Sequence, residues 1–144
     1  MTYDSVIRDL FARMPGLVPL YREQMSYLGD EELPYVVFGA FLIPVMETAL
    51  QNNDDESVRE ICAYLEEAAV SASNDPKLEL LLKVEVGEWL NGKSWEAQLG
   101  ASLGKETKRI CRYVPGLGTQ RATLREEQAR RSILSRVLNH LRPQ

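Results

Sequence analysis

Residues 33–46 read LPYVVFGAFLIPVM, a run without a single charged side chain. The run is shorter than the roughly 20 residues that a helix needs to cross a bilayer, so it predicts a buried core helix around which the chain is organised. Pro34 suits the first turn of a helix, whereas Pro44 removes a backbone hydrogen bond and crowds the carbonyl group of Ala40. Because Gly39 lies just over one turn earlier, we expect a kink or a break near Pro44.

The composition predicts one globular domain. The chain has 144 residues, of which 44% are hydrophobic and 26% charged, and both values are ordinary for a soluble protein. A helical pattern begins directly after Met1, with no charged and then apolar leader, so we expect a cytoplasmic protein. Cys62 and Cys111 are too few for a disulfide framework. They fall on apolar helical faces, which favours two buried, reduced thiols over a disulfide or redox pair.

Apolar residues recur at helical spacing along almost the whole chain. The predicted helices cover residues 4–14, 17–28, 34–50, a stripe at 58–69, 76–90, 94–114 with a break allowed near Gly104, and a last helix from 119 or 123 to 141. No segment alternates with period two, so we expect an all-α single domain of about six or seven helices. Residues 1–114 are the expected helical core, and residues 115–144 a loop plus a basic C-terminal helix packed on or extending from it.

Two of the predicted helices begin in the same way. Pro34 and Pro76 each open a helix, and the two positions are 42 residues apart, within the ~40–47-residue period of HEAT-type repeats. Asp75 is a favourable N-cap in front of Pro76. An irregular helical bundle and a short HEAT-like helical stack both remain open.

The sequence contains no motif for enzymatic chemistry or cofactor binding. The single histidine, His140, falls in the last turn of the C-terminal helix, where the helix dipole favours a cation, and it has no neighbouring ligands for a metal site. The glycines of residues 100–106 and 116–118 lack the other residues of nucleotide-binding loops. We therefore expect a protein that is not an enzyme and uses no cofactor. The carboxylates beside apolar faces that an active site would use are Glu47, Glu85 and Glu88.

The net charge of −4 is unevenly distributed. Residues 1–73 carry 4 Lys/Arg and 13 Asp/Glu, whereas residues 74–144 carry 13 Lys/Arg and 8 Asp/Glu. Such asymmetry indicates a charged partner or mutual neutralisation within the fold. For the basic C-terminal part we favour packing against the acidic half over a protein partner. Nucleic acid ranks last, because aromatic residues are scarce there.

Two acidic clusters each precede a predicted helix. The first comprises Asp30, Glu31 and Glu32, and the second comprises Asp54, Asp55 and Glu56. Negative charge at these places stabilises the positive end of a helix dipole. The same side chains are also the candidate partner-binding residues, because exposed carboxylates would meet a basic protein surface.

Two stretches resemble one protein family. Residues 32–42, ELPYVVFGAFL, resemble an ELPHVxFG-x-x-L opening, and residues 94–96, SWE, with residues 103–108, LGKETK, resemble a closing segment that contains MGxxTK. The family is an uncharacterised bacterial group of small, acidic, all-helical proteins, some of which resemble immunity proteins of toxin loci. Tyr35 stands where the family has histidine, and the chain after Pro115 has no counterpart. The resemblance implies a helical binding protein and supplies no catalytic residues.

Two functional hypotheses follow. The first is a non-enzymatic, immunity-type protein that neutralises a bacterial toxin domain, encoded next door, through its acidic clusters. The alternative is a helical scaffold or regulatory module that forms a homodimer through the apolar side of its C-terminal helix, Ile133, Leu134, Val137, Leu138 and Leu141. Neither a membrane nor nucleic acid is an expected partner.

Overall fold

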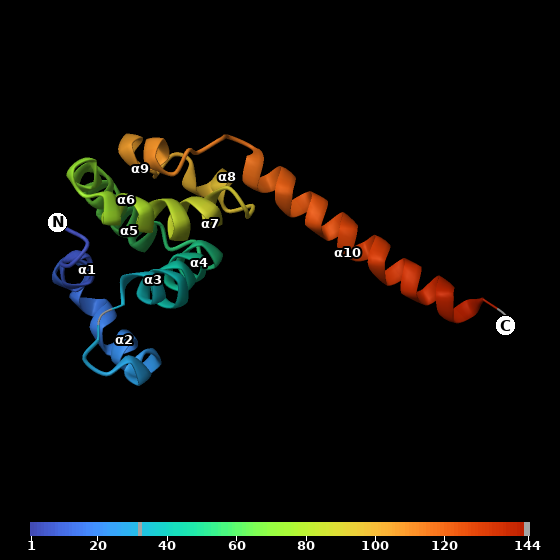
Figure 1. Cartoon of the computed structure of the whole chain (residues 1–144), viewed down its shortest axis with the longest axis horizontal. Helices are drawn as coiled ribbons and strands as arrows, with labels where there is room; N and C mark the ends of the chain where they lie inside the picture. The colour runs from blue at the N-terminus through green and yellow to red at the C-terminus, as the bar shows by residue number, and fades with distance from the viewer. Residues whose placement is uncertain (32, 143–144) are drawn as a thin grey trace.

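The central element of the fold is α5 (Asp55–Ser71). In the computed structural model, which describes residues 1–31 and 33–142, this helix contacts α1 (Val6–Arg13), α4 (Ile43–Gln51), α6 (Pro76–Leu81) and α9 (Lys105–Ile110) (Figure 1). Its buried side chains are Val58, Ile61, Cys62, Tyr64, Leu65, Ala68 and Ala69. The hydroxyl group of Tyr64 donates a hydrogen bond of 2.7 Å to the carbonyl oxygen of Val6, so this polar group is satisfied inside the core.

The described residues form a single all-α domain without strands, as the periodicity predicted. The shorter elements are η1 (Pro15–Leu17), α2 (Val18–Gln24), η2 (Ser26–Leu28), η4 (Ala72–Asn74) and α8 (Glu96–Leu99). The helix expected over residues 17–28 is divided among η1, α2 and η2. The helix expected over residues 94–114 is broken between α8 and α9, where Gly100 and Gly104 weaken helical structure.

Residues 34–51 form one helical segment whose hydrogen-bond pattern changes in the middle. α3 (Pro34–Val37) passes into the π-helical η3 (Phe38–Leu42), and α4 follows directly. The N–H of Ile43 donates to the carbonyl oxygen of Phe38, five residues back instead of four. This wider turn lies directly before Pro44, which has no N–H and would crowd a regular preceding turn. The predicted irregularity is therefore present as a π turn rather than as a break.

The helix formed by Pro34–Gln51 agrees with the helix expected over residues 34–50 and extends beyond the uncharged run of residues 33–46. Its 18 residues are long and apolar enough to cross a membrane by length and composition alone, so the argument that the run is too short to span a bilayer was wrong. Core helices of soluble proteins pass the same test, and 44% of this segment is buried inside the protein. Its side chains Phe38, Phe41, Leu42 and Met46 belong to the hydrophobic core. Their burial supports a core helix.

A second π turn occurs in the helix that begins at Pro76. Asp75 caps this helix, as predicted, by accepting two backbone N–H bonds, and α6 continues through the π-helical η5 (Leu82–Gly87) into α7 (Glu88–Leu90). The two π turns contact each other. Gly39 leaves room there for Glu85, since a Cβ atom at Gly39 would lie 2.8 Å from Glu85 Oε2. The helices that start at Pro34 and Pro76 thus share an opening proline and a π turn.

Glu66 joins α5 to the start of α9. Its carboxylate accepts the backbone N–H groups of Glu106 and Thr107, both at 2.9 Å, and the hydroxyl group of Thr107 at 2.8 Å. Gly104 is required beside it, because a Cβ atom there would overlap the Glu66 side chain. Partial burial raises the pKa of Glu66, but the three hydrogen bonds outweigh it and the net pKa is lowered.

Replacing Glu66 with alanine is expected to lower the free energy of unfolding by about 1–2 kcal/mol at pH 7, the usual cost of losing a helix cap. Because folding lowers the pKa of Glu66, its contribution is complete above the unfolded-state pKa and is lost as the pH falls through the folded-state pKa. The difference between the wild type and Glu66→Ala, measured by urea denaturation, should therefore shrink from pH 7 to pH 3.

The matched control is Glu67→Ala. Glu67 lies next to Glu66 on α5, and its substitution removes an ion pair with Arg13 of α1. Glu67 is exposed, so its loss is expected to cost less than about 1 kcal/mol. Equal losses for the two variants at pH 7 would contradict the capping role of Glu66.

Candidate functional site

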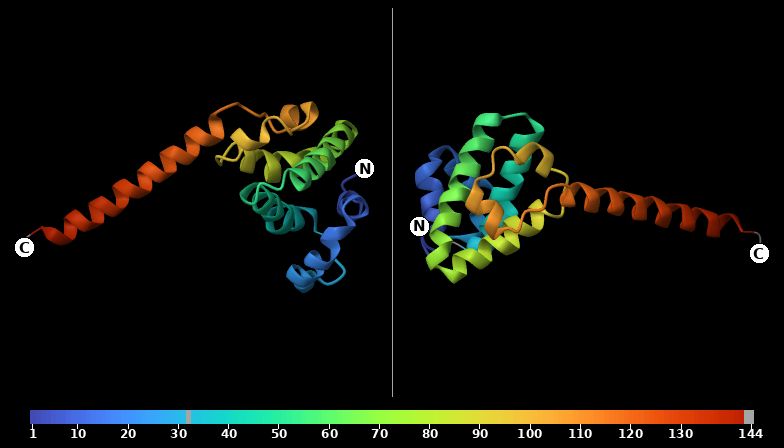
Figure 2. Two further views of the ribbon diagram at one scale, coloured as in Figure 1. Left: turned by 180° about the vertical axis from the view of Figure 1, so that it is seen from behind. Right: turned by 90° about the horizontal axis from the view of Figure 1, so that it is seen from above.

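α10 (Leu117–Leu141) leaves the rest of the protein as a single rod. It points away from the other helices in Figure 1 and in both views of Figure 2. Of its residues only Gly118 is buried. Of the two arrangements expected for residues 115–144, the structure has the helix extending from the core. The favoured interpretation, in which this helix packs along the acidic half of its own chain, was therefore wrong.

A buried carboxylate of α8 holds the start of α10. Glu96 is only 2% exposed, and it accepts the N–H of Gly116 at 3.0 Å and the N–H of Thr119 at 2.7 Å. N–H groups at the start of a helix have no partner within the helix, and a negative charge there also matches the helix dipole. Glu96 therefore fixes the point at which α10 leaves the other helices of the protein, which we term the body.

Further contacts hold the first turns of α10. Gly118 packs so closely on backbone carbonyl groups at the end of α7 and in the following loop that a Cβ atom would overlap them. Arg121 Nη1 donates to the carbonyl oxygen of Asn91 at 3.3 Å, and Arg125 Nη1 donates to that of Gly92 at 2.9 Å. These bonds fix the direction of the helix as well as its starting point.

The distal half of α10 exposes an apolar face. Its large side chains recur at helical spacing and are between 49% and 73% exposed: Ile133, Leu134, Val137, Leu138 and Leu141. Residues 119–141 contain neither glycine nor proline, so the sequence provides no point at which the helix would bend back. Residues 117–144 contain six arginines and two glutamates. The distal half is therefore a stiff, basic, amphipathic helix.

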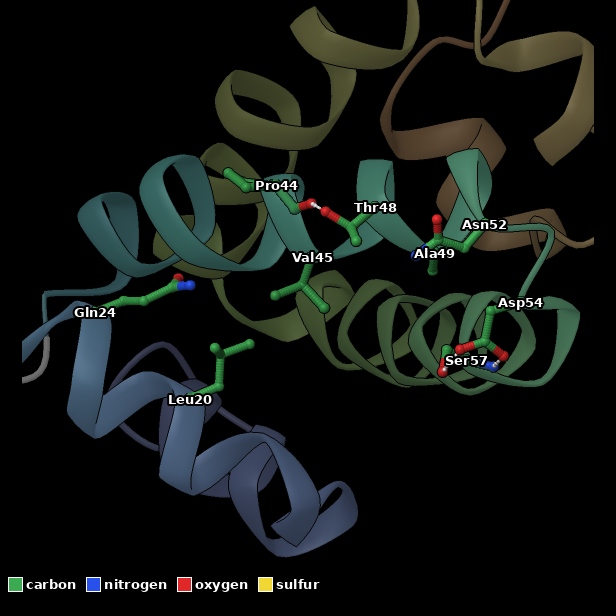
Figure 3. Close-up of a pocket in the computed structure, with 9 residues that line it drawn as sticks. All are labelled: Leu20, Gln24, Pro44, Val45, Thr48, Ala49, Asn52, Asp54 and Ser57. Carbon is green, nitrogen blue, oxygen red and sulfur yellow. Dashed lines mark hydrogen bonds between the residues drawn. The ribbon is translucent and has the colours of Figure 1, made fainter.

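A mostly apolar depression lies between α2, α4 and the start of α5. Figure 3 shows this hollow, which is about 350 Å³ in volume and is lined by Leu20, Gln24, Pro44, Val45, Thr48, Ala49, Asn52, Asp54 and Ser57. A second hollow of about 410 Å³ between α1 and α5 shares Val45 and Ser57 with it. We term the two hollows together the α2–α5 groove. Amphipathic helices bind other proteins in apolar grooves of this general kind.

Asp54, from the second acidic cluster, lines this groove and caps α5. Its Oδ1 accepts the N–H of Ser57 at 3.2 Å, and its Oδ2 accepts the Ser57 hydroxyl group at 2.6 Å. The bond from the hydroxyl group, followed by that from the backbone, lowers the pKa of Asp54. The groove therefore has a carboxylate at the end formed by the start of α5 (Figure 3).

None of the other described partner-binding candidates lines the groove. Asp55 and Glu56 are exposed in the first turn of α5, where they match the helix dipole. Asp30 and Glu31 are exposed after η2, which follows the α2 wall of the groove. Glu32 lies outside the described residues. The described members of both clusters are thus accessible at the surface.

The three candidate catalytic carboxylates have different surroundings. Glu47 accepts the indole N–H of Trp89 at 3.1 Å and lies 3.6 Å from Lys93 Nζ. Glu85 is half-buried at the contact of the two π turns, and its pKa is raised by burial and then by the charge of Glu88. Glu88 is exposed. Glu47 thus has a structural role as an acceptor for Trp89.

The predictions for the thiols and the histidine are confirmed. Cys62 and Cys111 are buried and free, and burial raises their pKa values to about 11 and about 12. His140 occupies the last turn of α10. Among residues 1–31 and 33–142, no group of three or more His, Cys, Asp or Glu is arranged to hold a metal ion.

The sequence patterns did not single out Glu96 or the groove. Glu96 lies three residues before Leu99 and seven before Leu103, which places it on the apolar side of a helix. That position was the available signal for a buried carboxylate. The groove had no such signal, because it forms where residues 13–24 meet residues 44–61.

No protein-family model, no curated protein and no solved structure matches this chain. Its function is therefore inferred from the surfaces described above.

Glu96→Ala is expected to loosen the start of α10. Two backbone N–H groups lose their acceptor, at a cost of about 1–3 kcal/mol, so the amide protons of Gly116 and Thr119 should exchange with solvent about tenfold faster or more, as followed by NMR. The matched control, Glu126→Ala, removes an exposed carboxylate from α10 itself and should leave both rates unchanged. Unaltered exchange in Glu96→Ala would show that another contact holds the helix.

Proposed function

We propose that this chain is a non-enzymatic protein-binding module and that the distal half of α10 is its principal binding element. The observation that carries the proposal is the apolar face formed by Ile133, Leu134, Val137, Leu138 and Leu141 on a helix that leaves the body. A contiguous exposed apolar face of this kind marks a protein interaction site in soluble proteins. Amphipathic helices of this type bind by placing their apolar face in a groove.

The way α10 is anchored supports the same function. Glu96, Arg121 and Arg125 hold the start of the helix in one direction. A binding helix that is already formed and oriented loses less conformational entropy on association than a disordered segment. The proposed activity requires no cofactor, nucleic acid or membrane, and its setting is the cytoplasm.

The double substitution Leu134→Glu/Leu138→Glu is expected to abolish partner binding, because two charges would have to be buried in the interface. Wild-type and variant chains carrying an N-terminal tag would be purified from their native host. Bound proteins would be identified by mass spectrometry and the complex reconstituted from pure components. The expected weakening in the reconstituted complex is about a hundredfold or more.

The control is Ser132→Glu/Asn139→Glu, which adds the same charge to the opposite face of α10 and should bind as the wild type does. A partner retained equally by all three chains would refute the role of the apolar face. Failure of the wild type to bind any protein, including copies of itself, would refute the binding function as a whole.

A second candidate partner is a bacterial toxin domain, as the immunity-type resemblance implies. It is supported by the exposure of Asp30, Glu31, Asp55 and Glu56 and by the carboxylate of Asp54 at the groove. Carboxylates at a surface speed association with a basic protein by electrostatic steering. On this proposal, the chain would neutralise the product of the neighbouring gene.

Asp55→Lys/Glu56→Lys tests this candidate and leaves the helix cap Asp54 intact. Co-expression with the neighbouring gene product should be protective with the wild type, and the double variant should slow complex formation by about tenfold or more at low salt. Glu126→Lys/Glu127→Lys makes the same charge change on α10 and serves as the control. Absence of both a complex and protection with the wild type would exclude the immunity function.

A further inference from the structure

We infer that the partner of α10 is a second copy of this chain, and that the α2–α5 groove of one copy holds the distal half of α10 from the other. The two copies would thus exchange their C-terminal helices in a two-fold symmetric dimer. The inference rests on the proposed function, because it names the partner that the apolar face of α10 binds.

The groove cannot be filled by the helix of its own chain. Glu96, Arg121 and Arg125 fix the first turns of α10 to the loops beside α7 and α8. A helix of 25 residues is roughly 37 Å long at 1.5 Å per residue. Since residues 119–141 contain no glycine or proline, the apolar half is carried away from its own body (Figure 2). Any groove that receives it belongs to another molecule.

The chemistry of the groove matches that of the helix. The groove offers apolar side chains such as Leu20, Pro44 and Val45, which suit the isoleucine, valine and leucine residues of α10. Asp54 lines the first hollow and Glu60 the second. Arg13, the basic residue that lines the second hollow, is already paired with Glu67. The arginines of α10 at positions 130, 131 and 136 adjoin the apolar face. Apolar surfaces would therefore meet in the centre and opposite charges at the edges, the usual layout of a specific interface.

The distribution of charge over the whole chain also favours a second copy. Residues 1–116 contain 11 Lys and Arg against 19 Asp and Glu, and residues 117–144 contain six Arg against two Glu. Two α10 helices laid side by side would bring like charges together. One α10 laid on the body of another copy brings opposite charges together.

Reciprocal exchange of the two α10 helices also increases the area that the dimer interface buries. Specific interfaces bury roughly 1,200–2,000 Å², and one helix face seated in one short groove provides only part of such an area. In a reciprocal dimer, both helices and both grooves are covered at once, and the symmetry closes the assembly without leaving a free site for a third copy.

The experiment uses the full chain. Sedimentation equilibrium should give about twice the 16.3 kDa of one chain, and an increase from 50 mM to 500 mM salt should raise the dissociation constant by about tenfold, because part of the attraction is ionic. To locate the contact, a copy with Val45→Cys would be mixed with a differently tagged copy with Leu138→Cys under mild oxidation. The native thiols are buried and their pKa values are raised, so they react slowly.

A disulfide between the Val45→Cys and Leu138→Cys copies, formed at least about tenfold faster than one between Val45→Cys and Asn139→Cys copies, supports the inference. A monomer at all concentrations overturns it. So does a dimer in which disulfides form only between two Leu138→Cys copies, because the helices would then pair with each other. If the chain is monomeric and Leu134→Glu/Leu138→Glu abolishes binding of a different protein, this inference fails and the proposed function stands.

Discussion

The arrangement of the helices depends on carboxylates that pair with free N–H groups at the helix starts. Asp54, Asp75, Glu66 and Glu96 do this for α5, α6, α9 and α10. Unpaired donors are costly where a helix start is packed against other elements. Asp75 also accepts the N–H of Tyr3, and Glu66 and Glu96 reach from other helices. Asp75, Glu66 and Glu96 therefore connect separate elements, and these acidic residues have a structural role.

Pro34 and Pro76 each open a long helical segment, and each segment also contains a π turn. η3 and η5 each widen the helix after the opening turn and contact each other in the core. In the first helix the wide turn accommodates Pro44 without ending the helix, so α4 continues toward α5. Gly39 leaves space at this contact for the side chain of Glu85, which is half-buried there.

The sequence was sufficient for features that depend on neighbouring residues. The apolar spacing predicted the all-α fold, and Asp75 with Pro76 predicted the start of α6. The two glycines marked the break between α8 and α9. Features that depend on distant residues could not be predicted, because Glu66 and Glu96 meet their partners 20 to 41 residues away. The groove likewise forms where residues 13–24 meet residues 44–61.

The exposure of α10 could not be predicted from the spacing of residues along the chain. The spacing of its apolar residues indicates a helix with one packing face. The sequence alone did not reveal whether that face packs on the body of the same chain. The anchoring at Glu96 and Gly118 decides the matter, because it points the helix outward. Most helices are stabilised by packing of an apolar face, and ion pairs such as that of Arg131 with Glu127 at 2.7 Å add only a few tenths of a kcal/mol. The distal half of α10 therefore lacks the packing that stabilises the other long helices of this protein.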